Sequence, residues 1–162
     1  MKTIKVLLTV FFVFSFLISQ NLKAQELKYE LLCEVKAFLD TPIIVGKTLL
    51  GTRTIYPIKG GTVEGQKING KVLPNGADWL LTLDSTTSKL DVRATMETDD
   101  GAIIYSSYSG YIHKNPDNSF YFRTNPIFET SSEKYKWLNY TIAVGVGSFI
   151  DGGVAYKIYG IK

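Results

Sequence analysis

The clearest candidate for chemistry is an acid beside a large aromatic residue, Asp78-Trp79, at the end of a glycine-rich stretch over residues 59–79. An indole ring that shields a carboxylate from water raises its pKa, and such a carboxyl group can act as a general base or hold a ligand. Asp78 is therefore the candidate catalytic residue. An aspartate that accepts backbone hydrogen bonds at the end of a turn is a simpler explanation, and both stay open.

A second set of residues has side chains suited to holding a flat or anionic group, at matching positions of strands that we expect to be neighbours. These candidate ligand-binding residues are Trp79, Arg93, Tyr121, Arg123, Trp137 and Asn139. Arginine binds planar and anionic groups through paired hydrogen bonds, and tryptophan stacks on flat rings. Turned inward, these side chains would line a pocket; turned outward, they would form the solvated face of the protein. The periodicity fits both.

Other kinds of site have little support in the sequence. His113 is the only histidine and Cys33 the only cysteine, so the chain can form no internal disulfide. We expect Cys33 to be a buried strand residue. No metal-ligand spacing, phosphate loop or nucleotide fingerprint occurs. We therefore expect neither a metal nor a cofactor.

The elements that must position these residues are strands. Aromatic and β-branched residues dominate, and glycine or Asn-Gly breaks recur at short intervals, which predicts an all-β fold. We expect a single antiparallel β-barrel of about nine or ten strands. A barrel of this size can hold a small ligand in its lumen.

Two strand predictions decide which side chains share a face. Residues 89–98 and 102–113 form a hairpin, and a two-residue loop at Asp100-Gly101 would pair Arg93 with Tyr108. One face would then carry Asp91, Arg93, Thr95, Ser106 and Tyr108. Residues 135–149 alternate over their whole length and are predicted to form one long strand, with Trp137 and Asn139 on the same side.

The N-terminus predicts export. Lysines precede an apolar run over residues 6–18, and a small residue, Ala24, follows, which is the pattern of a secretory signal peptide rather than a membrane helix. We expect residues 1–24 to be the signal and residues 25–162 the barrel domain, periplasmic or secreted, with no membrane-spanning segment after cleavage. The signal holds three lysines and no acid, which leaves 15 basic and 15 acidic residues. That balance gives no support to a nucleic-acid partner.

Several short motifs occur in one order along residues 31–161. They are Gly60-Gly61-Thr62-Val63-Glu64-Gly65, Gly70-Lys71-Val72-Leu73-Pro74-Asn75-Gly76-Ala77-Asp78-Trp79, Leu90-Asp91-Val92-Arg93, Thr98-Asp99-Asp100-Gly101-Ala102-Ile103-Ile104-Tyr105, Tyr121-Phe122-Arg123-Thr124 with Phe128-Glu129-Thr130, and Tyr135-Lys136-Trp137-Leu138-Asn139. With them the chain resembles domain-of-unknown-function family 3237, also called the UPF 0311 family. The resemblance implies a lipocalin-like barrel without a settled function, and some fungal relatives look like cofactor-free isomerases or cyclases acting on phenolic polyketides. The export signal departs from the family's usual pattern, as does Asn75, where glycine is common.

Three functions are consistent with this sequence. The first is a barrel that binds a small aromatic or phenolic molecule in its lumen. The second is an enzyme in the same pocket, with Asp78 as the base and an arginine stabilising the developing oxyanion. The third is a structural or interaction barrel without a ligand, and assembly into a homo-oligomer is left open.

Overall fold

The computed structural model describes residues 26–162, so the expected export signal lies outside the described part of the chain. All elements but one are strands. They are β1 (Tyr29–Leu39), β2 (Ile43–Lys47), β3 (Thr52–Glu64), β4 (Gly70–Val72), β5 (Ala77–Thr82), β6 (Thr87–Thr98), β7 (Ile103–Lys114), β8 (Phe120–Thr124), β9 (Ile127–Glu129), the 3-10 helix η1 (Lys136–Tyr140), β10 (Ala143–Ile150) and β11 (Gly153–Ile161). In this part of the chain, no helix has the length and apolar character needed to span a membrane.

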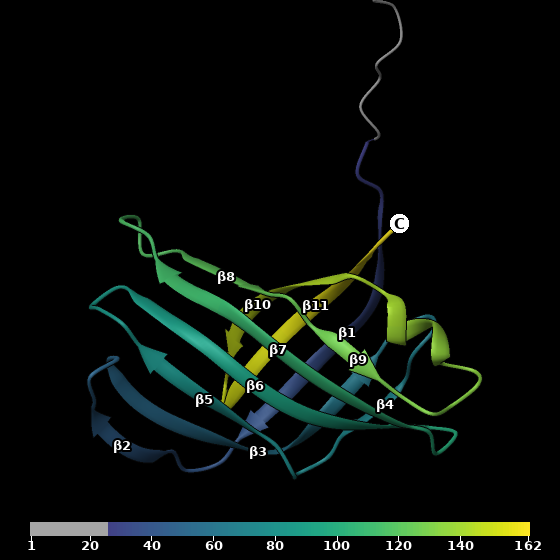
Figure 1. The fold of residues 1–162 in the computed structure, drawn as a ribbon, viewed down its shortest axis with the longest axis horizontal. Helices are drawn as coiled ribbons and strands as arrows, with labels where there is room; N and C mark the ends of the chain where they lie inside the picture. The colour runs from purple at the N-terminus through teal and green to yellow at the C-terminus, as the bar shows by residue number, and fades with distance from the viewer. Residues whose placement is uncertain (1–25) are drawn as a thin grey trace, which may run out of the picture.

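The strands form one antiparallel sheet that closes on itself (Figure 1). Its order runs β6-β5-β3-β1-β11-β10-β8-β7, and pairing of β6 with β7 completes the ring. The shorter strands extend this ring: β4 pairs with both β3 and β6, β9 pairs with β7, and β2 pairs with β3. The predicted all-β antiparallel barrel is confirmed, with 11 strands where about nine or ten were expected.

Alternation along β6 shows which face is the interior. Leu90, Val92 and Met96 are buried, whereas Asp91 and Arg93 between them are exposed. In β7 and β8 the buried positions include Ile104 and Phe122, both 0% exposed. Because side chains of a strand alternate between its faces, the apolar set fills the lumen and the polar set covers the outside.

The β6–β7 hairpin has a different register from the predicted one. Its loop has three residues, 99–101, with Thr98 and Ala102 joined by backbone hydrogen bonding and Glu97 opposite Ile103. Gly101 ends the loop at φ +83°, a left-handed conformation that suits a three-residue hairpin. A shift of one residue turns every following side chain to the other face. Ser106 and Tyr108 therefore point inward, not outward with the predicted polar set.

The prediction of one strand over residues 135–149 is wrong. Lys136–Tyr140 form η1, and β10 begins only at Ala143. A 3-10 helix has three residues per turn, so Tyr135 and Leu138 fall on the same side, and both are buried. Alternation had suggested a strand because Leu138, Tyr140 and Ile142 are apolar at every second position, but only Leu138 is buried, and Tyr140 and Ile142 are exposed.

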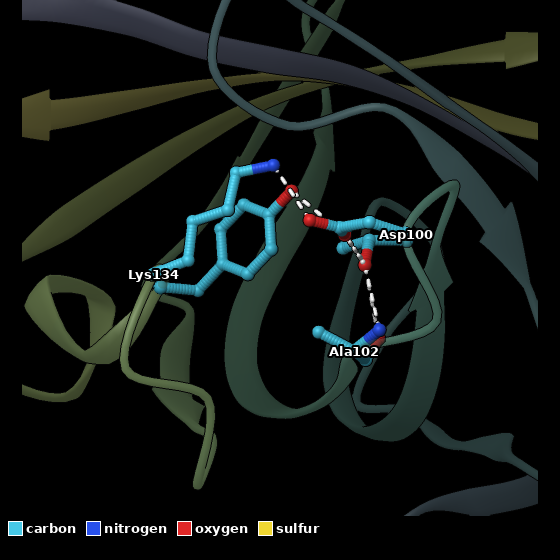
Figure 2. A network of polar contacts seen from close by, with 5 residues as sticks. Asp100, Ala102 and Lys134 are labelled. Atoms are coloured by element: carbon cyan, nitrogen blue, oxygen red, sulfur yellow. Dashed lines mark hydrogen bonds and ion pairs between the residues drawn. The ribbon is translucent and has the colours of Figure 1, made fainter.

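A polar network joins the segment before η1 to the β6–β7 turn (Figure 2). The Asp100 carboxylate accepts hydrogen bonds from Lys134 Nζ at 2.6 Å, from the Tyr135 hydroxyl at 3.1 Å and from Thr98 Oγ1 at 2.5 Å. Thr98 Oγ1 in turn accepts the Ala102 backbone N–H at 2.9 Å. The bond from Lys134, followed by the bond from Thr98, lowers the pKa of Asp100 to about 2. The network therefore holds both segments together as long as Asp100 is ionised.

Candidate functional site

The barrel encloses a cavity of about 410 Å³ that opens where the strands turn back at one end. The mouth is formed by the β5–β6 turn, by Lys114 at the end of β7 and by Phe120 and Phe149. The floor contains Tyr108 and Tyr156, which also line a smaller hollow of about 40 Å³ further along the barrel. These two tyrosines therefore separate the cavity from the remaining interior.

An unbroken series of aromatic rings runs along one wall of the cavity, from the mouth to the floor. Phe120 packs on Phe149 with ring centres 5.1 Å apart, and Phe149 lies 5.5 Å from Phe122. Phe122 packs on Tyr156 at 5.3 Å, and Tyr156 on Tyr108 at 5.7 Å. These residues come from β7, β8, β10 and β11, which are consecutive neighbours in the sheet although they are spread over the C-terminal third of the chain.

Asp78 lies on the opposite side of the lumen, within a row of residues across four strands. It sits opposite Tyr56 of β3 and Val92 of β6, and Val92 sits opposite Tyr108 of β7. Because paired residues of neighbouring strands lie on the same face of a sheet, Tyr56, Asp78 and Tyr108 all face the cavity, and all three line it.

The sheet is locally opened beside Asp78. Pairing of β5 with β6 stops after Asp78 and resumes at Leu81. The Asp91 N–H is donated to Asp78 Oδ1 at 3.2 Å, and the Trp79 carbonyl oxygen accepts a hydrogen bond from Arg53. Both backbone groups therefore keep partners, which a partly buried backbone requires. The opening holds the Asp78 carboxyl group at the cavity wall.

The cavity makes the carboxyl group a weaker acid and keeps the phenols neutral. Burial raises the pKa of Asp78 from 3.8 to about 7, although the Asp91 N–H and the Arg53 charge oppose the rise. Burial also raises the pKa of Tyr108 and of Tyr156, and the nearby Asp78 carboxylate adds to both increases. At neutral pH, Asp78 can therefore release or accept a proton while the phenols remain hydrogen-bond donors.

Asp78 lines the cavity, but the other predicted site residues do not. Trp79 follows Asp78 and Arg93 follows the buried Val92, so both side chains point to the outer surface. There, Arg93 lies 5.2 Å from the Trp79 ring and forms an ion pair with Asp91 at 3.0 Å. Of the two orientations left open for Trp79 and Arg93, the structure therefore has the outward one, because the apolar alternate residues occupy the lumen.

Strand β8 shows the same arrangement. Phe122 is fully buried, so Tyr121 and Arg123 on either side of it point outward. The Arg123 guanidinium lies 5.0 Å from the centre of the Tyr121 ring. The two arginines thus decorate the outside of the barrel and do not converge on its cavity.

Trp137 and Asn139 belong to η1 and are also outside the cavity lining. The Asn139 side chain accepts the Thr130 N–H at 2.8 Å and donates to the Thr130 carbonyl oxygen at 2.9 Å. The Trp137 ring lies 5.4 Å from Lys67 Nζ. Asn139 therefore holds the loop that precedes η1, whereas it had been expected to bind a ligand.

The cavity residues that sequence reasoning missed are the phenols and the aromatic wall. The hairpin register would have placed Tyr108 inside if a three-residue loop ending at Gly101 had been chosen. No local signal connects Tyr108 with Tyr156, because β7 and β11 meet across the lumen. Within residues 26–162, no three side chains of His, Cys, Asp or Glu come together in a way that could hold a metal ion.

Comparison with known families identifies the kind of protein to which this barrel belongs. The family model described as "Protein of unknown function (DUF3237)" matches residues 27–161. The chain belongs to this family. The resemblance found in the motifs is thus confirmed over nearly the whole described chain.

Named relatives of this DUF3237 chain are bacterial UPF0311 proteins. One from Clostridium acetobutylicum is 36% identical over 153 residues, which cover 85% of this chain and 96% of the relative. One from Rhodopseudomonas palustris is 37% identical over 114 residues, which cover 62% of this chain and 74% of the relative.

Solved structures share the barrel. A protein from Acinetobacter baumannii described as beta-barrel like superposes with a TM-score of 0.84 at 35% identity, covering 88% of this chain and all of that one. A structure described as an enzyme from Penicillium herquei superposes with a TM-score of 0.72 at 22% identity, covering 88% of this chain and 99% of that one. At 22% identity, the second likeness shows the fold alone.

Proposed function

We propose that the protein binds a small aromatic or phenolic molecule in the lumen of its barrel. The supporting observation is the aromatic wall from Phe120 to Tyr108, which faces a polar group formed by Asp78 and Tyr56. The volume of about 410 Å³ lies in the range of known small-molecule sites, which are mostly apolar with a few polar groups that fix orientation.

Each part of the cavity has a role in this proposal. A flat ring lying against Phe122 and Phe149 gains edge-to-face or offset contacts and loses its exposure to water. A hydroxyl group on that ring donates a hydrogen bond to the Asp78 carboxylate. The neutral Tyr108 and Tyr156 hydroxyls can donate to a ligand oxygen, which would favour an oxygenated ring over a plain hydrocarbon.

Proton transfer in the same cavity is the second candidate, as in a cofactor-free isomerase or cyclase. It is favoured by the Asp78 pKa of about 7, which suits a general base at neutral pH. Asp78 would remove a proton from the substrate, and the phenols of Tyr108 and Tyr156 would stabilise the developing oxyanion. The phenols take the place of the arginine first expected there, since Arg93 and Arg123 do not line the cavity.

A ligand screen with two matched variants tests the binding proposal. A specific ligand raises the melting temperature, so naphthols and phenolic acids are compared with aliphatic alcohols of similar size. Ile112→Trp fills the cavity, whereas Tyr111→Trp changes the neighbouring, exposed residue of β7. We expect the aromatic probes to stabilise the unsubstituted chain and Tyr111→Trp, but not Ile112→Trp. Equal shifts of the melting temperature in both variants, or no shift with any aromatic probe, would contradict binding in the lumen and favour a barrel without a ligand.

Turnover separates the second candidate from plain binding. Once an aromatic ligand is found, Asp78→Asn is compared with the unsubstituted chain for affinity and for conversion of the ligand, followed by chromatography. Binding in both chains with conversion only in the unsubstituted chain supports the enzyme. Absence of conversion in both leaves the binding protein as the function.

Export is proposed on the sequence pattern alone. We propose that residues 1–24 direct the chain across a membrane and are then removed, so that the barrel acts in the periplasm or outside the cell. The mass of the protein recovered from the periplasm or the medium of an expressing bacterium tests this. Recovery of an uncut chain in the cytoplasm would contradict the proposal.

A further inference from the structure

We infer that the ligand is an aromatic acid that binds with its acidic group at the mouth, beside Lys114, and its hydroxyl end at Asp78. This inference rests on the proposed function and names the class of its ligand. Its basis is the distribution of charge along the cavity: the charged side chains in the lining are Asp78 at the inner end and Asp84 and Lys114 at the mouth.

Lys114 is fixed in position through its backbone. It is the last residue of β7 and lies opposite Phe120, the first residue of β8 and of the aromatic wall. Its N–H is donated to the Thr86 carbonyl oxygen at 2.9 Å, which joins the end of β7 to the β5–β6 turn. None of the ion pairs formed among residues 26–162 includes Lys114. Its ammonium group thus remains able to pair with an anion at the mouth.

Asp84 stabilises the β5–β6 turn at the mouth of the cavity. Its Oδ1 accepts hydrogen bonds from the Thr86 N–H and hydroxyl, both at 2.8 Å, and from the Thr87 N–H at 2.9 Å. The bonds from Thr86 hold the pKa of Asp84 below its ordinary range. Asp84 therefore keeps its negative charge, but this oxygen is turned to its own loop, and none of the ion pairs among residues 26–162 joins Asp84 to Lys114.

The inner end of the cavity rejects a second anion. A carboxylate placed there would lie beside Asp78, where burial already opposes one negative charge. A neutral hydroxyl group can donate to Asp78 and accept from Tyr108 without that penalty. The two ends of the cavity therefore select different polar groups and set the direction of the ligand.

The spacing of the two ends indicates the size of the aromatic part. Tyr108 and Lys114 are six residues apart on β7, which places their Cα atoms about 20 Å apart along an extended strand. The lysine stem and the phenols reach into this span from its ends. A fused or linked ring system therefore fits the distance better than one ring does.

Three probes and two variants test this assignment. The probes are a hydroxynaphthoic acid with its two polar groups on opposite rings, its methyl ester, and a naphthol without the acid. Their dissociation constants for the full chain are measured by titration calorimetry. Lys114→Met removes the charge at the mouth, and Lys89→Met removes an exposed lysine from the outer face of β6 near the same end.

We expect Lys114→Met to weaken binding of the acid about two- to fivefold, as is usual for an exposed ion pair, and to leave binding of the ester unchanged. Lys89→Met should alter neither. The inference is wrong if acid and ester respond alike to Lys114→Met, or if the naphthol binds and the acid does not. Failure of all three probes to bind the unsubstituted chain would overturn the proposed function itself.

Discussion

Replacement of Asp78 by asparagine tests the electrostatics on which the site depends. Asparagine has nearly the same shape, and its Oδ1 can still accept the Asp91 N–H, but it cannot ionise. The comparison therefore isolates the cost of a negative charge at the cavity wall. Asp99→Asn, which removes an exposed carboxylate in the β6–β7 turn, is the matched control for the loss of one charge.

The magnitude follows from the difference between the folded and unfolded pKa values. A carboxyl group whose pKa is about 7 when folded and 3.8 when unfolded binds its proton more tightly in the folded protein. Its contribution to stability is fully present below pH 3.8 and is lost as the pH rises through about 7. Proton linkage then gives a loss of roughly 2–3 kcal/mol in the free energy of unfolding between about pH 5 and pH 8.

Urea denaturation at several pH values across this range measures the effect. We expect the free energy of unfolding of the unsubstituted chain to fall by roughly 2–3 kcal/mol more than that of Asp78→Asn, with Asp99→Asn behaving as the unsubstituted chain does. Parallel pH profiles for the unsubstituted chain and Asp78→Asn would refute the raised pKa. They would also remove the argument for Asp78 as a base at neutral pH.

Three further substitutions test other parts of the barrel. The unsubstituted chain should lose stability as the pH falls from about 4 to about 2, because the ionised Asp100 carboxylate holds the network only above its lowered pKa, and Asp100→Asn should remove this loss. Melting temperatures measured across that pH range test the prediction. Equal losses in both chains would contradict it. Gly147→Ala should lower the free energy of unfolding, measured in urea, by about 1–3 kcal/mol, since its Cβ would lie 2.6 Å from ring atoms of Phe122. Replacement of the exposed neighbour, Ser148→Ala, should change it little. Equal losses in the two variants would show that the ring moves freely. Leu138→Ala should cost about 2–5 kcal/mol because this side chain of η1 is 0% exposed, and a cost under about 1 kcal/mol would mean that η1 does not pack on the core.

The cavity floor could not be read from the sequence because it joins residues of distant strands. Tyr108 and Tyr156 meet across the lumen, and Asp78 reaches its place through an opening between β5 and β6. Alternation within one strand defines two faces without stating which is the interior. In β6 the apolar side chains line the lumen, so Arg93 lies on the outer surface with its ion-pair partner Asp91.

What the sequence determined by itself is local in origin. Turn residues and two-residue alternation predict antiparallel strands, and ordered motifs identify the family, because both depend on neighbours along the chain. Asp78 was singled out by the aromatic residue beside it, but that reason was wrong, because Trp79 points to the outer surface and burial at the cavity wall raises the pKa of Asp78. The tertiary structure alone decided the direction of each side chain, because a single added loop residue at Gly101 reverses a strand's faces. It also decided the aromatic wall, because the pairing of β7, β8, β10 and β11 sets their rings side by side.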